Sequence, residues 1–276
     1  MTDQSYAAWI GRQEIRTDRM DGARTLALRA ALGQPAGLSD GDPLPLLHHW
    51  LYFWDVRPPA GLTEDGHPAR GEFLPPVALP RRMWAGGRLV FHQPLRIGET
   101  VERTSTISAI ETKTGRSGTL VFVTVTHDLV GAAGLAIREV QDLVFREAAA
   151  PGQTAPAPEV DDAPAAWTRT VAADVVLLFR YSALMMNGHR IHYDLPYAVG
   201  EEGYDGLVVQ GPLQAQLMID LAQAHGQVRS FAFRGISPAT HMAPLAVMGS
   251  PTKTGAGLWT RQSRRRCMTA DVDFAP

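Results

Sequence analysis

Hydrophobic and polar residues alternate with a period of two between Arg88 and Arg146, and this pattern is typical of β-strands. The runs are rich in Val, Thr, Ile and Phe, and turn-forming stretches such as TKTGRSG and GAAG separate them. Their ranges are 101–111, 118–130 and 135–147. We expect them to form an antiparallel meander.

Ahead of this region, the pattern favours helices and a long loop. Residues 5–33 are predicted as helical, with Asp21 as an N-cap and Gly33 as the stop. Residues 43–55, PLPLLHHWLYFWD with the preceding aspartate as entry, are expected to form a short, nearly all-apolar helix that lies in a core, since it has no polar face. Residues 56–87 are rich in Pro and Gly and are predicted as loop.

The second half repeats this order. Residues 147–166 are an Ala- and Pro-rich linker. A strand followed by a helix is expected over 167–185, and a second helix over 211–226, where Gly226 stands as a C′ residue. The apolar stripe of that helix is Leu213, Leu217, Leu221 and Ala224. Short β-like runs follow at 228–235, 244–251, 257–263 and 267–274.

Each half therefore consists of one apolar helix followed by several antiparallel strands. A buried helix wrapped by a curved sheet satisfies such a pattern, and two copies can join sheet edge to sheet edge. We predict a duplicated α+β chain with an N-terminal unit at 1–147, a linker at 148–166 and a C-terminal unit at 167–276.

Composition narrows the function classes. The chain has 276 residues, 45% of them hydrophobic, so a substantial core can form. A net charge of −2 gives no electrostatic footprint for nucleic acid or for an anionic membrane, and neither is expected as a partner. No signal-peptide or membrane-spanning run is found, and the single cysteine, Cys267, fits a reducing compartment. We expect a cytoplasmic protein.

The segment NGHRIHYD, residues 187–194, concentrates polar chemistry between two helices. It lies close before the helix predicted at 211, whose free backbone N–H groups can receive negative charge. His189, His192 and Asp194 could hold a metal ion, but the H-E-x-x-H pattern is absent and no cysteine lies nearby, so no metal is predicted. Ser182 lacks the G-x-S-x-G context of an activated serine.

NGHRIHYDLPYA followed by GPLQAQL resembles the motif of the MaoC-like R-specific enoyl-CoA hydratases, D-x-N-P-x-H-x-D-P-x-A. With FLPPVALPRRMWAGGRLVFHQPLRIGE in the first half, the chain is similar to a narrower branch. That branch holds the mesaconyl-C4-CoA (3-methylfumaryl-CoA) and itaconyl-CoA hydratases and the type 2 hydroxyacyl-thioester dehydratases. The resemblance covers about 9–274 and implies a double hotdog fold.

The resemblance implies roles for the motif residues. His192 takes the place of the catalytic histidine and Asp194 that of the second aspartate, while Gly211 opens the helix whose amide faces the thioester oxygen. Asn187 stands where the family has a catalytic aspartate, and His189 where it has an asparagine. We expect His192 to be the principal acid–base group, Asn187 to position water, and His189 to be a second candidate for proton transfer. Asp194 is expected to orient the loop.

Substrate contacts are predicted from the acyl groups of the resembling branch. A dicarboxylic acyl chain suits an arginine fork, and one of four arginines, Arg82 or Arg190 in preference to Arg81 and Arg180, is expected near it. Trp84 is expected to line the acyl channel together with Gly86 and Gly87, and Tyr193 and Asp194 to complete the substrate contacts.

The sequence therefore predicts a hydro-lyase that adds water to an unsaturated CoA thioester, with mesaconyl-C4-CoA as the leading substrate and no cofactor. Itaconyl-CoA hydration and a 3-hydroxyacyl-thioester dehydratase of fatty-acid type are alternatives within the family. A hotdog thioesterase would require a carboxylate on the central helix, where Gln214 and Gln216 offer amides. A non-catalytic acyl-CoA-binding protein is favoured only by the Asp-to-Asn departure. A homodimer remains an open alternative to a monomer.

Overall fold

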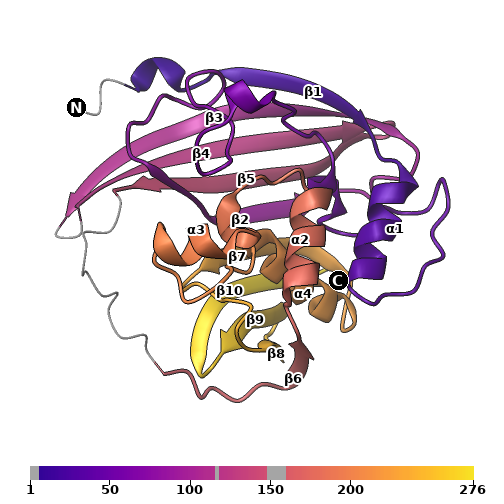
Figure 1. Cartoon of the computed structure of the whole chain (residues 1–276). Helices are drawn as coiled ribbons and strands as arrows, with labels where there is room; N and C mark the ends of the chain where they lie inside the picture. Colours follow the sequence, from indigo (N-terminus) through magenta and orange to yellow (C-terminus); the bar gives the residue numbers. More distant parts are fainter. Residues whose placement is uncertain (1–5, 116–117, 148–159) are drawn as a thin grey trace.

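The computed structural model describes residues 6–115, 118–147 and 160–276, which build one continuous antiparallel sheet with helices on its concave side (Figure 1). The ten strands are ordered β1-β3-β4-β5-β2-β7-β10-β9-β8-β6. Their bounds are β1 Gln13–Arg19, β2 Arg81–Phe91, β3 Thr100–Gly115, β4 Gly118–Gly131, β5 Gly134–Arg146, β6 Trp167–Val171, β7 Val228–Gly235, β8 Leu245–Pro251, β9 Gly255–Gln262 and β10 Arg265–Phe274. The helices are α1 Gly22–Ala31, α2 Val175–Leu184, α3 Leu195–Gly200 and α4 Gly211–Gln223.

The predicted meander is confirmed. Strands β3, β4 and β5 pair with their chain neighbours in antiparallel register, and alternate residues of β4 are buried, as the period-two pattern requires. The second group, β7 to β10, also lies where short strands were predicted.

The two groups of strands join at β2 and β7, which pair from Gly86 opposite Arg234 to Val90 opposite Ser230. At this seam a Cβ on Gly86 would lie 2.5 Å from the carbonyl oxygen of Phe233, so only glycine allows the two backbones to approach. The expected edge-to-edge joining is therefore present as backbone pairing.

Helix α4 is the central helix of the C-terminal half. Nine of its 13 residues are buried, on all sides of the helix, and it packs on β7, β8, β9 and β10. A helix without a polar face is stable only inside a core. The prediction of a helix at 211–226 is confirmed, but Gly226 is not its C′ residue: the helix ends at Gln223, and Gly226 instead leaves room for the ring of Phe274.

Three predictions for the N-terminal half are wrong in part. Within 5–33 only α1 is a regular α-helix; its N-cap Asp21 accepts a hydrogen bond from the amide of Arg24, and Gly33 follows at φ +67° as expected. Residues Gln13–Arg19 form the edge strand β1 instead, paired with β3, and exposed positions alternate with partly buried ones along it. The loop predicted over 56–87 ends early, since β2 begins at Arg81.

The apolar segment 43–55 is buried as predicted but is not an α-helix. It contains only a 3₁₀ turn at His48–Leu51, because Leu47 and Phe53 on either side take left-handed backbone conformations that stop a helix. This segment covers part of the sheet around the buried carboxylate of Glu139, which accepts hydrogen bonds from Trp50 at 2.9 Å and from Gln141 at 2.8 Å and lies 3.0 Å from His49 Nε2.

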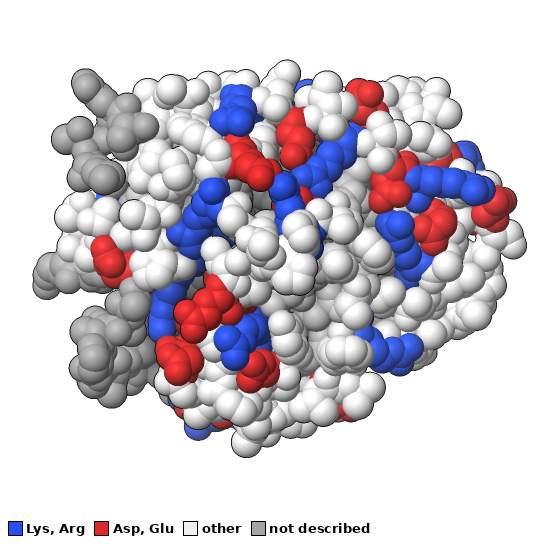
Figure 2. Space-filling view, turned by 45° about the horizontal axis from the view of Figure 1, so that its top comes forward, with Lys and Arg blue, Asp and Glu red and all other residues white. Residues whose placement is uncertain are grey.

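The predicted linker falls largely on 148–159, outside the described residues, so the proposed division into units remains a prediction. None of the helices within the described ranges is both long and apolar enough to cross a membrane. On the face drawn in Figure 2, acidic and basic side chains lie next to one another instead of in separate patches.

Candidate active site

The motif segment connects α2 to α3, and local hydrogen bonds fix its path. The chain turns back after α2 at Met186, whose φ is +51°, and the amide of Asn187 bonds to the carbonyl of Ser182 at 2.8 Å. The side-chain oxygen of Asn187 accepts the amide of His189 at 3.1 Å, a turn typical of asparagine. A 3₁₀ turn at Arg190–His192 follows.

His192 is held at the entrance to α4. Its ring is 7% exposed, and Nδ1 lies 2.7 Å from the carbonyl oxygen of Val208, so this nitrogen carries the hydrogen and Nε2 keeps its lone pair. Burial lowers the pKa of His192 to about 4, the bond to Val208 opposes this, and the nearby His67 adds to it. His192 is therefore neutral near pH 7. Since Val208 lies three residues before Gly211, the imidazole is attached to the segment that leads into α4.

The first turn of α4 offers an unused backbone donor. Gln210 precedes it, and the Gln210 amide group bonds to the carbonyl of Leu178 and to the hydroxyl of Ser182, both at 2.9 Å, which ties the start of α4 to α2. The N–H of Gly211 has no acceptor in the part of the chain that the structure describes. A Cβ on Gly211 would meet only Met268 at 3.5 Å and the carbonyl of Trp84 at 3.9 Å.

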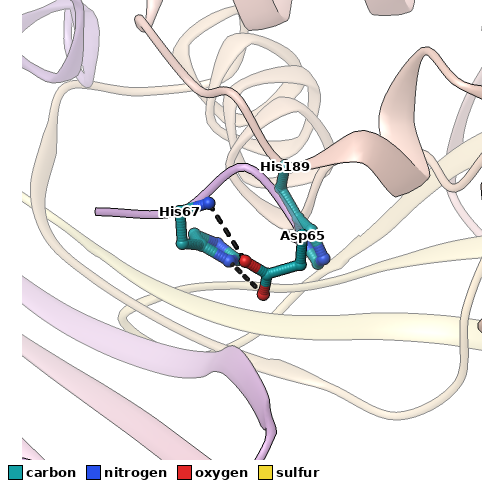
Figure 3. A group of neighbouring side chains, drawn as sticks. All are labelled: Asp65, His67 and His189. Carbon is teal, nitrogen blue, oxygen red and sulfur yellow. Dashed lines mark hydrogen bonds and ion pairs between the residues drawn. The ribbon is translucent and has the colours of Figure 1, made fainter. Parts of the chain in front are cut away.

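A loop of the N-terminal half brings two further polar residues to this place. Asp65 and His67 lie beside His189, and Figure 3 shows the three side chains converging from two segments of chain. The Asp65 carboxylate bonds both Nδ1 of His67, at 2.8 Å, and the backbone amide of His67, at 3.1 Å. Although burial alone would raise the pKa of Asp65, hydrogen bonds from His67 and Thr63 hold it well below its usual range.

Close backbone contact docks this loop against the motif. A Cβ on Gly66 would lie 1.9 Å from the carbonyl oxygen of Gly188, and Gly66 has a φ of +89°, so glycine is required on both grounds. The amide of Arg190 bonds to the carbonyl of Asp65 at 2.9 Å. Two loops more than a hundred positions apart in the sequence thus lie in direct backbone contact. Sequence reasoning missed this loop, although DGHP, a turn sequence carrying a carboxylate and an imidazole, was the signal available.

Three imidazoles follow one another across the site. The ring centroids of His67 and His189 are 4.2 Å apart and those of His189 and His192 are 5.5 Å apart. Burial, with the charges of His67 and His192, lowers the pKa of His189 to about 2, and burial followed by Arg82 lowers the pKa of His67. The site as a whole favours neutral rings.

The four candidate arginines differ in their partners. Arg81 pairs with Glu202 at 3.1 Å, Arg190 pairs with Asp194 at 2.8 Å, and Arg180 lies exposed on α2. Arg82 is half-buried, close to the Asp65 and His67 loop, and its guanidinium has no hydrogen-bond partner within 6–115, 118–147 and 160–276. Burial lowers the pKa of Arg82 to about 10, so it remains charged at pH 7.

The remaining predicted residues have structural contacts. The Trp84 ring packs at 5.0 Å on Trp50 and at 5.9 Å on Phe233. Gly87 faces the Phe233 ring, which would lie 3.1 Å from a Cβ there, so this glycine serves the seam.

On the motif segment itself, two of the residues predicted to contact the substrate form hydrogen bonds that shape the loop. The Tyr193 hydroxyl donates to the carbonyl of Gly188 at 2.8 Å. Asp194 caps α3 by accepting the amide of Tyr197 at 3.2 Å.

The three metal ligands considered from the sequence, His189, His192 and Asp194, do not form a set, since Asp194 is ion-paired with Arg190. Asp65, His67 and His189 instead have ligand atoms within 4.8 Å of one another. That geometry could accept a divalent cation, but the Asp65 oxygens already hold His67 and Thr63.

Comparisons with known proteins show the family of the chain. Residues 47–241 match the family model of hydroxyacyl-thioester dehydratase type 2. The mesaconyl-C(4)-CoA hydratase of Chloroflexus aurantiacus is 47% identical over 257 residues, 91% of either chain. The mitochondrial hydroxyacyl-thioester dehydratase type 2 of Schizosaccharomyces pombe is 28% identical over 82% of this chain and 81% of its own.

Solved structures share the fold. A MaoC-like dehydratase superimposes with a TM-score of 0.71 at 16% identity, covering 97% of this chain and 99% of its own. HtdX of Mycobacterium tuberculosis gives 0.67 at 17% identity, covering 96% and 100%. A further M. tuberculosis protein, described as having a double hotdog fold, gives 0.56 at 12% identity, covering 95% of each chain. The chain belongs to the hydroxyacyl-thioester dehydratase type 2 family and is a hydro-lyase with a double hotdog fold.

Proposed function

We propose that this protein adds water across the double bond of a branched C5 dicarboxylic CoA thioester, with mesaconyl-C4-CoA as the substrate. The observation that carries the proposal is a neutral, buried imidazole, His192, bonded to Val208, three residues before the unused amide of Gly211. The name of the C. aurantiacus relative supports the choice of acyl chain. Itaconyl-CoA and unbranched 3-hydroxyacyl thioesters are the other substrates to compare.

Hydration requires a proton to leave water, the enolate oxygen to be stabilised, and a proton to reach Cα. A positioned imidazole contributes about 10²–10⁴-fold to such transfers. His192 exchanges protons with the substrate through Nε2, since its Nδ1–H is already bonded to Val208. The Gly211 amide, at the positive end of α4, donates to the thioester oxygen, and one such donor contributes about 3 kcal/mol to transition-state stabilisation.

Asn187 holds the attacking water, because an amide is not a base near neutral pH but can donate and accept hydrogen bonds. Its side-chain oxygen also shapes the turn that carries His189. His189 is the second candidate for proton transfer on this loop, and Asp194, paired with Arg190 and capping α3, orients the segment.

Arg82 recognises the carboxylate at the end of the acyl chain. A charged, half-buried guanidinium without a described partner can gain two charge-assisted hydrogen bonds from a carboxylate. Arg81 and Arg190 are already paired with acidic residues and are poorer candidates. Trp84, two residues along β2, supplies apolar contact for the acyl chain.

The test is substitution of His192 by alanine, followed by the absorbance of the conjugated thioester in mesaconyl-C4-CoA. We expect turnover to fall by at least a hundredfold. The matched control is His92→Ala, which removes an exposed imidazole directly after the last residue of β2. Near-normal turnover of the His192→Ala protein, with an unchanged unfolding transition, would refute the assignment.

A thioesterase is the alternative from another class. It would release free thiol from the same substrate, and a thiol reagent separates the two activities. A thioesterase would also require a carboxylate on α4, where this chain has the amides of Gln214 and Gln216. Both amides already have partners: Gln214 accepts the hydroxyl of Thr260 at 2.7 Å, and Gln216 donates to Asp220 at 2.8 Å. A binding protein without activity would leave the absorbance unchanged. We further propose that the enzyme works in the cytoplasm. Its molar mass measured by light scattering distinguishes a monomer from a homodimer.

A further inference from the structure

Proton transfer through His192 creates a positive charge in a buried site, and burial disfavours that charge. The bond from Nδ1–H to the neutral carbonyl of Val208 offsets the effect of burial on the pKa of His192 only in part, and the charge of His67 adds to that effect. Asp194 is directed to Arg190 and to the start of α3. An imidazolium on His192 alone is therefore unfavourable in this buried site.

Asp65 is the one carboxylate within the described residues that is hydrogen-bonded to any of the three clustered rings. Its Oδ2 accepts Nδ1–H of His67, which leaves the lone pair of His67 on Nε2. A carboxylate behind an imidazole fixes its tautomer and stabilises the imidazolium that forms on proton uptake. Within residues 6–115, 118–147 and 160–276 the His67 ring makes its hydrogen bond through Nδ1 and none through Nε2.

The loop that carries this pair is positioned rigidly. The backbone amide of His67 also donates to Asp65, and Thr63 donates its hydroxyl to the same carboxylate. The contact of Gly66 with Gly188 then fixes the loop against the motif. The His67 ring lies against the His189 ring at a tilt of 40°, and the His189 ring meets His192 edge to face.

We propose that His67, positioned by Asp65, is a second catalytic acid–base residue and takes the proton of the attacking water. This supplies the base that the motif lacks at Asn187. The O–H bond of water breaks as its oxygen bonds to Cβ, the proton goes to Nε2 of His67, and the π electrons move to the thioester oxygen. Protonated His67 then passes this proton to the lone pair on Nε2 of His192, which delivers it to Cα as the thioester carbonyl re-forms, so both imidazoles end neutral and no other reactant is consumed.

The inference rests on the proposed hydration and deepens it. The experiment compares His67→Gln and Asp65→Asn with the wild type, in steady-state hydration of mesaconyl-C4-CoA between about pH 5 and 9. We expect kcat to fall by about 10²–10⁴-fold in His67→Gln, with KM nearly unchanged. Glu64→Gln, which removes an exposed carboxylate next to Asp65, is the matched control and should keep wild-type turnover.

The pH profile separates a catalytic role from a structural one. Asp65→Asn removes the anion that stabilises protonated His67, so the pKa of His67 falls and the acid limb of kcat should move to lower pH, with a smaller maximum. The groups that face His67 are Arg82, Arg70, Asp65 and His189, and the substitution changes only one of them. In His67→Ala, added imidazole should restore part of the turnover, because a free base can occupy the space of the ring.

The outcomes are distinguishable. If the wild type does not hydrate any of the tested thioesters, the proposed function fails. Near-normal kcat in His67→Gln with an active wild type overturns the inference alone, as does an unshifted acid limb in Asp65→Asn. A stoichiometric divalent metal in the purified protein, lost together with activity on chelation, would also overturn it, because Asp65, His67 and His189 would then be ligands.

Discussion

Replacement of Arg82 by methionine tests how the acyl carboxylate is recognised. Burial lowers the pKa of Arg82 from 12.5 to about 10, which corresponds to about 3 kcal/mol of unfavourable free energy on the charged guanidinium. A bound carboxylate offsets most of this, and partial exposure of the side chain reduces the gain to about 2–3 kcal/mol. Loss of that gain lowers kcat/KM for mesaconyl-C4-CoA by about 30–150-fold.

The assay is the same loss of thioester absorbance, run in parallel on mesaconyl-C4-CoA and on crotonyl-CoA, which has no terminal carboxylate. We expect the Arg82→Met protein to hydrate crotonyl-CoA as the wild type does, within about threefold. Arg81→Met is the matched control, because its guanidinium is paired with Glu202 at 3.1 Å. An equal loss on both substrates would show that Arg82 supports the fold or the chemistry, and the reasoning would be wrong.

Two further substitutions test the architecture. Gly66→Ala should lower kcat more than tenfold, because its Cβ would lie 1.9 Å from the Gly188 carbonyl oxygen. Gly71→Ala is the control and should not lower kcat, because Gly71 has a similar positive φ but its nearest contact would be at 3.8 Å. Equal kinetics of the two variants would contradict the role of Gly66 in docking the loop. Burial raises the pKa of Glu139, but the His49 hydrogen bond and charge outweigh this and bring the pKa to about 2 from 4.5. A depressed carboxyl pKa stabilises the fold fully above about pH 4.5 and loses this as pH falls towards 2, so Glu139→Gln should cost about 3 kcal/mol of unfolding free energy near pH 7 and less near pH 3.5. Urea unfolding at both pH values measures this, and an equal loss at both would refute the linkage.

The sequence was sufficient for elements whose local pattern agrees with their final environment. Alternation over 88–146 predicts β3 to β5, and the apolar stripe that begins at Leu213 predicts α4. It failed for 43–55, where the hydrophobic run is buried as expected but the left-handed residues Leu47 and Phe53 prevent a helix. It also failed for β1, because Gln13–Arg19 contains one apolar residue, Ile15, and therefore shows no hydrophobic alternation. Periodicity reports burial better than it reports backbone conformation in short apolar runs.

The site was predicted only as far as it is contiguous in the sequence. The segment 187–194 and Gly211 stand close together in the chain, so a motif could place them near one another. Asp65 and His67 reach the same place through a glycine-to-glycine backbone contact between distant loops, and no local pattern encodes such a contact. Arg82 was one of four arginines, and it is distinguished from Arg81 and Arg190 by their ion pairs and from Arg180 by the exposure of Arg180 on α2.

The pairing of β2 with β7 makes one polypeptide do what a symmetric pair of identical subunits would otherwise do. Two identical subunits would have to share every substitution, so a change that improves substrate binding in one subunit would also occur at the equivalent position of the other. Joined in one chain, the two halves can diverge independently: the C-terminal half contains the buried helix α4, while the N-terminal half contributes Asp65, His67 and Arg82. Asymmetry of this kind allows one half to become selective for an acyl group while the other half keeps the residues that add water.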